Sequence, residues 1–268
     1  MDGKLALVTG AGSGIGRETA LLCARRGASL ALCDVNEAGL AETERDARRL
    51  GCDVFTQSVD VGDRAQMQQF AAAVHARAAA VDLLVNNAGV GLGAGFLETP
   101  LEDWDWILPI NLMGVVHGCH MFVPAMVERG GGGHVVNLSS AAGYFANPSL
   151  AAYTATKFAV LGLSEALRIE LRPLGIGVTA VCPGLINTPI TRNSRLRGTA
   201  EAQRERVVRL YQRRNYGPDR VAGRILHAVQ RNRAVMPVTA EAWGMWWLAR
   251  FAPSLARGVA RAIDAGAR

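Results

Sequence analysis

The feature that most constrains the fold of this chain is a repeated alternation between short apolar runs and helix-length segments. The runs are "KLALVT", "ASLALCD", "DVFTQSVD", "VDLLVNN", "GGHVVNLSS", "GVTAVCP" and "RAVMPV", and each is followed or preceded by a segment long enough for a helix. Such alternation indicates βαβ units, whose parallel strands form one sheet with helices on both faces. Because βαβ crossovers are right-handed, the predicted fold class is α/β with a doubly wound parallel sheet.

Length and composition set the limits of this fold. The chain has 268 residues, of which 50% are hydrophobic, so it can bury a sizeable core. No internal repeat, low-complexity tract or linker interrupts the sequence. We therefore predict a single domain over residues 1–268.

Several classes of protein are disfavoured by the sequence. No apolar run approaches the roughly 18 residues of a membrane span, and "MDGKLALVTG" enters a strand pattern without a secretory signal. The five cysteines are scattered and odd in number, which is typical of buried thiols in a reducing compartment, so we expect a cytoplasmic protein. The net charge of +6 favours anionic ligands, but no basic run is interleaved with aromatics, so nucleic-acid binding is not expected.

A glycine-rich turn, "TGAGSGIG", follows the first predicted strand and opens a helix near Gly14. Glycines let the backbone turn tightly and let a pyrophosphate approach, while the helix N-terminus supplies free N–H groups. A tight turn without a ligand is the alternative. The position between strand and helix favours cofactor binding, with these candidate residues: Gly10, Ser13, Gly14, Ile15 and Gly16.

Asp34 ends the second predicted strand, where a carboxylate can bind the hydroxyls of an adenosine ribose and repel a 2′-phosphate. No basic side chain occurs at Ser13, Val35 or Asn36 to receive such a phosphate. We therefore expect NAD in preference to NADP, although Arg17 lies close enough to leave NADP open. A role for Asp34 as a simple helix cap is the other interpretation.

Tyr153 and Lys157 stand four residues apart, so a helix would place them on one face about a turn apart. The chain has only one other lysine, Lys4. A nearby ammonium favours the phenolate and would lower the tyrosine pKa, which lets tyrosine act as a general acid or base. Lysine suits this role as a compact charge with rotatable donors. The spacing alone is also common in ordinary helices.

Other strand ends supply polar or turn residues to the same edge of the predicted sheet. "VVNLSS" ends at Ser139 and Ser140, "LLVNNAG" continues through Asn86 to Gly89, and "GVTAVCPG" ends at Pro183 and Gly184. Ligands of open α/β sheets bind beyond the carboxyl ends of the strands. The sequence therefore predicts one crevice that contains the glycine turn and these strand ends.

These motifs resemble those of the classical short-chain dehydrogenases/reductases. The similarity includes "TGAGSGIG", "NNAG", "NLMG" from Asn111, a serine 13 positions before the tyrosine, "YTATK" and "PGLINT", in the family's order, over nearly the whole chain. The resemblance implies a single Rossmann-like domain with strand order 3-2-1-4-5-6-7. It also implies a nicotinamide-dependent oxidoreductase that interconverts a secondary alcohol and a ketone.

The resemblance assigns expected roles residue by residue. Tyr153 would be the general acid/base, Lys157 would lower its pKa and hold the nicotinamide ribose, and Ser140 rather than Ser139 would orient the reacting oxygen. Asn111 would anchor a water in a proton relay to Lys157. Further cofactor contacts are implied beside the adenine, along the cleft and at the carboxamide: Asp60, Val61, Asn87, Ala88, Gly89, Pro183, Gly184, Ile186 and Thr188.

A metal site is not expected. "HGCH", His117 to His120, is too short a pattern and has no second ligand pair, so buried or interface histidines are the better interpretation.

The residues after Thr188, about 188–216, match the family's mobile lid and carry many arginines. These arginines form either a solvated helix face or an attraction for an anionic or carrier-bound substrate. An aromatic and basic segment at about 240–262 is expected to pack on the lid or at a subunit interface, with a membrane-surface helix as the lesser alternative.

We expect a hydrophobic small-molecule substrate. A ketoreductase acting on a carrier-bound acyl intermediate is the alternative, and a non-catalytic nucleotide-binding protein is a weaker one. The resemblance further implies a homodimer or homotetramer formed through the long central helices, here 104–126 and 153–172.

Overall fold

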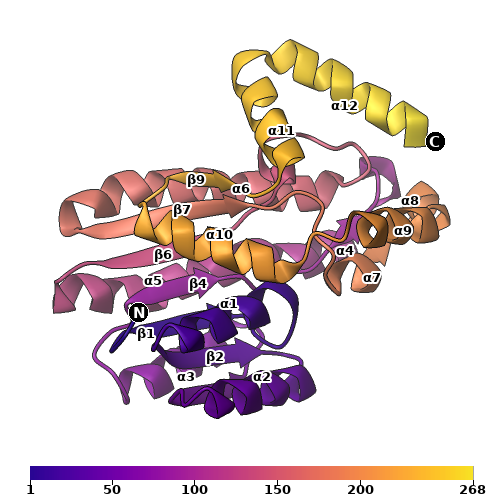
Figure 1. Cartoon of the computed structure of the whole chain (residues 1–268). Coiled ribbons are helices and arrows are strands. Elements are labelled where there is room, and N and C mark those ends of the chain that lie inside the picture. Colours follow the sequence, from indigo (N-terminus) through magenta and orange to yellow (C-terminus); the bar gives the residue numbers. More distant parts are fainter. Residues whose placement is uncertain (268) are drawn as a thin grey trace.

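The computed structural model describes residues 1–267 and contains one seven-stranded parallel sheet (Figure 1). From edge to edge, the strands are β3 (Val54–Ser58), β2 (Ser29–Asp34), β1 (Leu5–Thr9), β4 (Leu83–Asn86), β6 (Gly133–Leu138), β7 (Ile176–Cys182) and β9 (Val235–Pro237). With the two-residue strands β5 and β8 set aside, this is the order 3-2-1-4-5-6-7. The predicted strand order and fold class are therefore confirmed.

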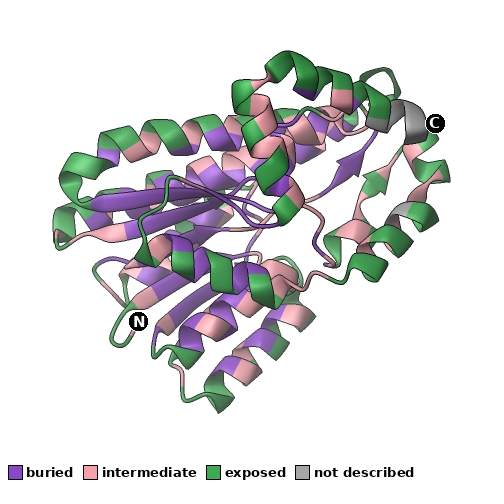
Figure 2. Ribbon diagram, turned by 45° about the horizontal axis from the view of Figure 1, so that its top comes forward, coloured by how far each residue is buried: buried purple, intermediate pink, exposed green. Residues whose placement is uncertain are grey.

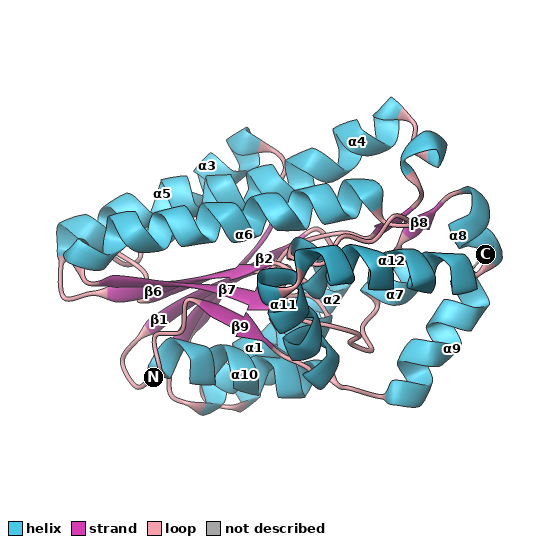
Figure 3. Cartoon of the chain, turned by 90° about the horizontal axis from the view of Figure 1, so that it is seen from above, coloured by secondary structure: helices cyan, strands magenta, loops and turns pink. Residues whose placement is uncertain are grey.

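Helices cover both faces of the sheet (Figure 3). One face carries α1 (Gly14–Arg25), α2 (Glu37–Arg49) and α10 (Pro218–Gln230). The other carries α3 (Arg64–His75), α5 (Gly114–Arg129) and α6 (Ala151–Leu171). The central strands are consequently buried on both sides, as Figure 2 shows, and this explains why they are continuously apolar rather than alternating.

Short polar side chains fix where some of these helices begin. Asn36 accepts a hydrogen bond from the N–H of Gly39 at the start of α2. Asp63 accepts from Ala65 and Gln66 at the start of α3. Such N-caps satisfy N–H groups that have no partner within the helix. The caps hold the helices directly after the strand ends that form the site.

A continuous helical run, Leu101–Arg129, joins α4 (Leu101–Leu108), a π-helical turn over Pro109–Met113 and α5. By length and mean hydropathy alone this run could cross a membrane. Half of its most apolar stretch is buried inside the fold, and core helices of globular proteins give the same signal.

The predicted lid, about 188–216, forms α7 (Ile190–Asn193), β8 (Arg195–Leu196), α8 (Gly198–Ala202) and α9 (Arg204–Arg214). Strand β8 pairs in parallel with β5 (Leu92–Gly93), which lies just beyond β4. This small ribbon was not predicted from the sequence. It joins the beginning of the lid to the central sheet region.

The aromatic C-terminal segment forms two helices, α11 (Ala240–Phe251) and α12 (Pro253–Ala267), which stand over the β9 edge of the sheet (Figure 1). Met245 and Trp246 pack on Tyr144 in a separate apolar cluster. The other face carries a stacked row of Trp243, Trp247 and Phe251, whose Phe251 is 74% exposed. The segment thus packs on the fold with one face only.

Candidate active site

The glycine turn is folded so closely that side chains would not fit at two positions. A Cβ on Gly10 would lie 2.7 Å from the Cα of Ala88, and a Cβ on Gly16 would lie 2.1 Å from the carbonyl oxygen of Gly10. Gly10 and Gly14 also have φ values of 66° and 53°, which favour glycine. Gly16 therefore acts beneath the turn and does not line the cavity described below.

The first turn of α1 remains available for an anion. Its N-cap, Ser13, makes no side-chain hydrogen bond to the helix, so no side chain satisfies the first N–H groups. Uncapped N–H groups and the helix dipole together favour a phosphate at this position. The geometry fits the pyrophosphate of a dinucleotide.

Asn87 fastens the glycine turn to the end of β4. Its Nδ2 donates to the carbonyl oxygens of Thr9, at 2.9 Å, and Gly10, at 3.1 Å. The Thr9 hydroxyl accepts from the N–H groups of Asn87 and Ala88. Asn87 thus positions the turn in addition to lining the predicted cofactor cleft.

Asp34 lies at the carboxyl end of β2 and is oriented by two backbone donors. Its Oδ2 accepts from the N–H of Gly12 at 2.7 Å, and its Oδ1 accepts from the N–H of Asn36 at 2.8 Å. Arg17, the nearby cation, forms ion pairs with Glu42 and Asp46 on α2, at 2.9 and 2.7 Å. The arginine is therefore held by α2 carboxylates.

The loop after β3 lines the part of the crevice where the adenine is predicted to bind. Asp60 accepts from the N–H of Gly62, and Val61 is 5% exposed. A Cβ on Gly114 would lie 2.7 Å from the Val61 side chain, so glycine there lets α5 pack against this loop. His117 contacts the carbonyl oxygen of Val61 through Nδ1 at 2.9 Å. His117 is buried and supports the loop, as predicted for "HGCH", whereas His120, the second histidine of that pattern, is exposed.

Ser139 and Ser140 have different surroundings at the end of β6. The Ser139 hydroxyl donates to the carbonyl oxygen of Lys157 at 2.8 Å and is buried. Ser140 caps the short turn Ala141–Gly143, where its Oγ accepts from the N–H of Ala142 at 3.1 Å. Its own O–H is left to donate to a neighbouring oxygen, and the Ser140 side chain interacts with that of Tyr153. Its predicted role in orienting a substrate oxygen stays a prediction.

Tyr153 and Lys157 lie one turn apart in α6, with Nζ of Lys157 5.6 Å from the centre of the Tyr153 ring. Nζ also donates to the carbonyl oxygen of Leu138 at 2.8 Å. Burial lowers the pKa of Lys157 to about 8. The hydrogen bond to Leu138 holds the Lys157 ammonium at the end of β6, beside Tyr153.

The pKa of Tyr153 is raised in this structure, whereas a lowered value is expected from the sequence. Burial raises the pKa of Tyr153, and an interaction with the Ser140 side chain only partly opposes the rise. Desolvation disfavours the phenolate more strongly than the neighbouring groups favour it. In the free protein Tyr153 is therefore a neutral hydroxyl at neutral pH, suited to donating a proton.

Asn111 is completely buried in the π-helical turn before α5. Its Oδ1 accepts from the N–H of Val90 at 2.8 Å, and its Nδ2 donates to the carbonyl oxygen of Val90 at 2.9 Å. A Cβ on Gly89 would lie 3.2 Å from Asn111 Oδ1 and 3.6 Å from Lys157 Nζ. Asn111 holds the loop after β4 against α6. Its predicted role in a water relay stays a prediction.

The loop after β7 lines the part of the crevice where the nicotinamide is predicted to bind. A Cβ on Gly184 would lie 2.3 Å from the Thr239 hydroxyl, so glycine lets the loop approach the start of α11. Glu241 of α11 accepts from the N–H of Leu185 and forms an ion pair with Arg214 at the end of the lid. Ile186 is 4% exposed. Glu241 thus joins the cofactor loop to the lid.

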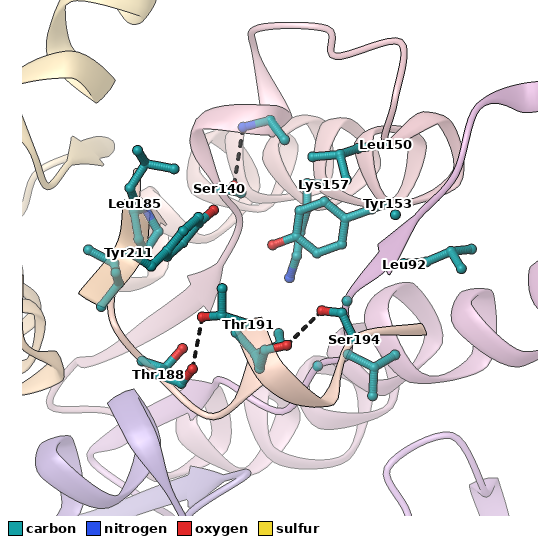
Figure 4. A pocket seen from close by; sticks show the side chains of 18 of the residues that line it. Leu92, Ser140, Leu150, Tyr153, Lys157, Leu185, Thr188, Thr191, Ser194 and Tyr211 are labelled. Atoms are coloured by element: carbon teal, nitrogen blue, oxygen red, sulfur yellow. Dashed lines mark hydrogen bonds between the residues drawn. The ribbon is translucent and has the colours of Figure 1, made fainter. Parts of the chain in front are cut away.

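One cavity of about 1800 Å³ brings the predicted residues together (Figure 4). Small-molecule sites commonly occupy roughly 300–1,000 Å³, so this cavity has room for a dinucleotide and a sizeable substrate. Apart from Gly16 and Asn111, which lie behind its wall, it is lined by every predicted site residue: Gly10, Ser13, Gly14, Ile15, Asp34, Asp60, Val61, Asn87, Ala88, Gly89, Ser140, Tyr153, Lys157, Pro183, Gly184, Ile186 and Thr188.

Several lining residues were not singled out from the sequence. Leu92, Leu150, Leu185 and Tyr211 surround the Tyr153 side chain in Figure 4. Burial raises the pKa of Tyr211 to about 12. These residues come from four separate segments, so no local pattern indicates that they meet.

A buried carboxylate fixes the beginning of the lid. Asp103 of α4 is 1% exposed and pairs with Arg195 and Arg197, with nitrogen–oxygen distances of 3.2 and 2.8 Å. Arg195 also stacks over the Trp106 ring. The arginine hydrogen bonds hold the pKa of Asp103 below its ordinary value. We call Asp103, Arg195 and Arg197 the lid clamp.

Among the described residues, no group of three or more His, Cys, Asp or Glu side chains is arranged to hold a metal ion.

Comparison with known proteins establishes the family. The family model described as "short chain dehydrogenase" matches residues 4–198. The chain is 42% identical over 263 residues to the "Probable oxidoreductase EphD" of Mycobacterium tuberculosis, covering 96% of this chain and 44% of that protein. It thus spans less than half the length of this relative. It is also 37% identical over 191 residues to the 3-oxoacyl-[acyl-carrier-protein] reductase FabG of Thermotoga maritima, covering 71% of this chain and 77% of that protein.

Solved structures agree with the sequence comparison. A short chain dehydrogenase/reductase from Burkholderia phymatum, in complex with NAD, superposes with a TM-score of 0.87 at 33% identity, covering 92% of each chain. An actinorhodin polyketide ketoreductase with NADPH superposes with a TM-score of 0.78 at 31% identity, covering 89% of this chain and 97% of that chain. This chain belongs to the short-chain dehydrogenase/reductase family of oxidoreductases. Solved structures similar to it include complexes with NAD and with NADPH.

Proposed function

We propose that the protein is an NAD(H)-dependent oxidoreductase that interconverts a secondary alcohol and a ketone on a hydrophobic substrate. The observation that carries the proposal is the joint position of Ser140, Tyr153 and Lys157 on the wall of a cavity that also contains the glycine turn and Asp34. A bound nicotinamide supplies or accepts the hydride. The geometry of the turn and the uncapped start of α1 fit such a cofactor.

The protein's own residues would handle the substrate oxygen and its proton. Ser140 would donate a hydrogen bond to that oxygen, because its Oγ is oriented by Ala142. Tyr153 would give its proton to the developing alkoxide in reduction and take it back in oxidation. Lys157 would stabilise the phenolate left on Tyr153, because its ammonium lies one helical turn away.

Replacement of Tyr153 by phenylalanine tests the assignment. Loss of general acid/base catalysis is expected to lower kcat by about 10²–10⁴-fold. NAD binding, followed by calorimetry, should persist because the ring and its packing remain. Wild-type turnover of secondary alcohols and ketones by Tyr153→Phe would contradict the assignment and favour a non-catalytic nucleotide-binding role.

We further propose a preference for NAD over NADP. Asp34 lines the cavity, where it would meet the adenosine ribose, and Arg17 forms ion pairs with Glu42 and Asp46. Asp34→Asn keeps the side-chain shape and removes the repulsion, so the ratio of kcat/KM for NAD to that for NADP should fall by about tenfold. Arg17→Gln, the matched variant, should leave that ratio unchanged. An unchanged ratio in Asp34→Asn would contradict the proposal.

The second candidate is a ketoreductase for an acyl chain on a carrier protein. It is favoured by the similarity to FabG and by the basic surface of the lid. A 3-oxoacyl chain on a carrier protein and the same chain on N-acetylcysteamine distinguish the two. Carrier-dependent turnover would replace the first candidate by the second.

A further inference from the structure

The outer end of the cavity is basic, whereas the part around Tyr153 carries several apolar side chains. Near Tyr153 the lining includes Leu92, Leu150, Leu185 and Tyr211, and it is otherwise completed by hydroxyl groups such as those of Thr191 and Ser194 and by Lys157 (Figure 4). Farther out, α9 contributes arginines, and Figure 3 shows this helix standing away from the sheet. The same cavity therefore presents two chemically different environments.

Four arginines of α9 line the cavity. Arg204 is held by Glu201 and by the carbonyl oxygen of Arg192, which leaves Arg206, Arg209 and Arg213. Their spacing of three and four residues places them on one face of the helix. Arg209 pairs with Glu205 at 3.2 Å, but both side chains are largely exposed, so water screens the pair. Within the part of the chain that the structure describes, the side chains of Arg206 and Arg213 form no ion pair or hydrogen bond.

Two glutamates that line the cavity, Glu241 and Glu98, are already engaged by other groups. Glu241 is held by Arg214 and by the N–H of Leu185. Glu98 accepts from the N–H and the hydroxyl of Thr199. Like charges at such spacings destabilise a helix slightly, and among the described acidic groups only the exposed Glu205 pairs with one of them, Arg209. An anion that enters the cavity would provide the missing partner.

From this arrangement we infer that the substrate is an elongated amphiphile. Its apolar body carries the ketone or alcohol beside Tyr153, and its anionic head group, a carboxylate or phosphate, binds Arg206, Arg209 and Arg213. The inference rests on the proposed function, because it assigns a substrate class to the same site. The opposite end of the cavity, at Asp34, is left to the cofactor.

Binding of a simple probe tests the inference without turnover. With NAD saturating, octyl phosphate should bind about tenfold more tightly than octanol, and added salt should reduce the difference. Arg206→Gln/Arg213→Gln should remove most of the preference. Arg224→Gln, an exposed arginine of α10 outside the cavity, should retain it. Equal binding of the two probes, or an unchanged preference in the double variant, would overturn the inference.

Turnover separates this inference from the proposed function. The substrates are a medium-chain ketone with a terminal carboxylate, its phosphate-ended counterpart and its methyl ester. We expect both anionic compounds to have a KM about tenfold below that of the ester, with similar kcat. Comparison of the KM of the carboxylate with that of the phosphate compound identifies the preferred head group. Turnover of all three with equal KM would overturn only the inference. No NAD(H)-dependent turnover of any of them, together with binding of octyl phosphate, would count against the proposed function alone.

Discussion

Lys157 is a residue for which arginine should be a poor substitute. Its Nζ occupies a buried position between the Leu138 carbonyl and the Tyr153 ring, where a compact ammonium fits. A planar guanidinium is larger and carries its donors in a fixed fork. We expect Lys157→Arg to lose most turnover, at least tenfold, although the charge is retained. Steady-state kinetics with NAD would measure this loss, and near-normal activity would show that charge alone suffices.

The pKa of Lys157 also sets the expected pH dependence. Burial lowers this pKa to about 8, so the ammonium is present below pH 8 and is lost as the pH rises through that value. The pKa of Tyr153 is raised, so the tyrosine keeps its proton over the same range. Ketone reduction should therefore decline above about pH 8, as measured by kcat/KM. The residual activity of Lys157→Arg should lack this decline, since a guanidinium stays charged.

The sequence predicts residues of the site well where a local motif carries them. The turn from Thr9 to Gly16 and the Tyr153–Lys157 pair each lie within a few residues of chain, so their geometry follows from one turn or one helix. The direction of the Tyr153 pKa was wrong, because burial depends on segments far away in the sequence. Glu241 was missed for a related reason, since nothing near it indicates contact with Leu185.

At the scale of elements, the alternation of strands and helices predicts the sheet, but the lid's attachment could not be predicted. Asp103 lies in "LEDWDW", an ordinary acidic helix start, and its partners follow more than 90 positions later. Parallel pairing of β5 with β8 involves only two residues on each side, too few for a periodic signal. The lid clamp is visible only in three dimensions.

Removal of one charge from the lid clamp should loosen the lid selectively. Asp103→Asn keeps the side-chain shape but weakens the charged hydrogen bonds to Arg195 and Arg197. Residues 195–203 should exchange amide hydrogens faster, and KM should rise more than kcat falls. Glu102→Gln, an exposed neighbour on α4, is the control and should change neither. Unchanged exchange in Asp103→Asn would show that the β5–β8 ribbon alone holds the lid.

The clamp should also withstand moderate acid. The arginines lower the pKa of Asp103, so its stabilising contribution is complete above the ordinary aspartate pKa. It is lost only as the pH falls through the lowered value. In hydrogen exchange, wild-type protection of residues 195–203 should therefore persist at mildly acidic pH. Early loss of this protection would indicate that Asp103 is not the controlling group.

At the scale of the whole molecule, α6 presents an apolar stripe that suits a second copy of the chain. Phe158 is 42% exposed and Ile169 is 78% exposed, and a Cβ added at Gly162 between them would meet nothing within 4 Å. Among the described residues of α6, the exposed Glu165 is the one charged residue on this face of the helix. Small and apolar residues on one helix face allow close packing of helices. This stripe belongs to the segment 153–172, where the sequence predicts a subunit interface.

A charge introduced into this stripe should prevent self-association. We expect wild-type protein to be a dimer or tetramer, and Phe158→Glu to shift it to a smaller species, because an unpaired charge would be buried at the interface. Light scattering after size-exclusion chromatography measures the change. Leu50→Glu, at a comparably exposed leucine after α2, is the control. A monomeric wild type would contradict the prediction.

The two ends of the lid are fastened by carboxylates that lie outside it, Asp103 on α4 and Glu241 on α11. In both of these attachments the lid contributes arginines: Arg195 and Arg197 pair with Asp103, and Arg214 pairs with Glu241. We therefore expect the segment between Arg197 and Arg214 to be exchangeable as a unit. The match to the family model ends at residue 198, where this segment begins. Grafting the corresponding segment of a relative between Arg197 and Arg214 should change substrate choice, while Ser140, Tyr153 and Lys157, which lie outside the segment, stay the same.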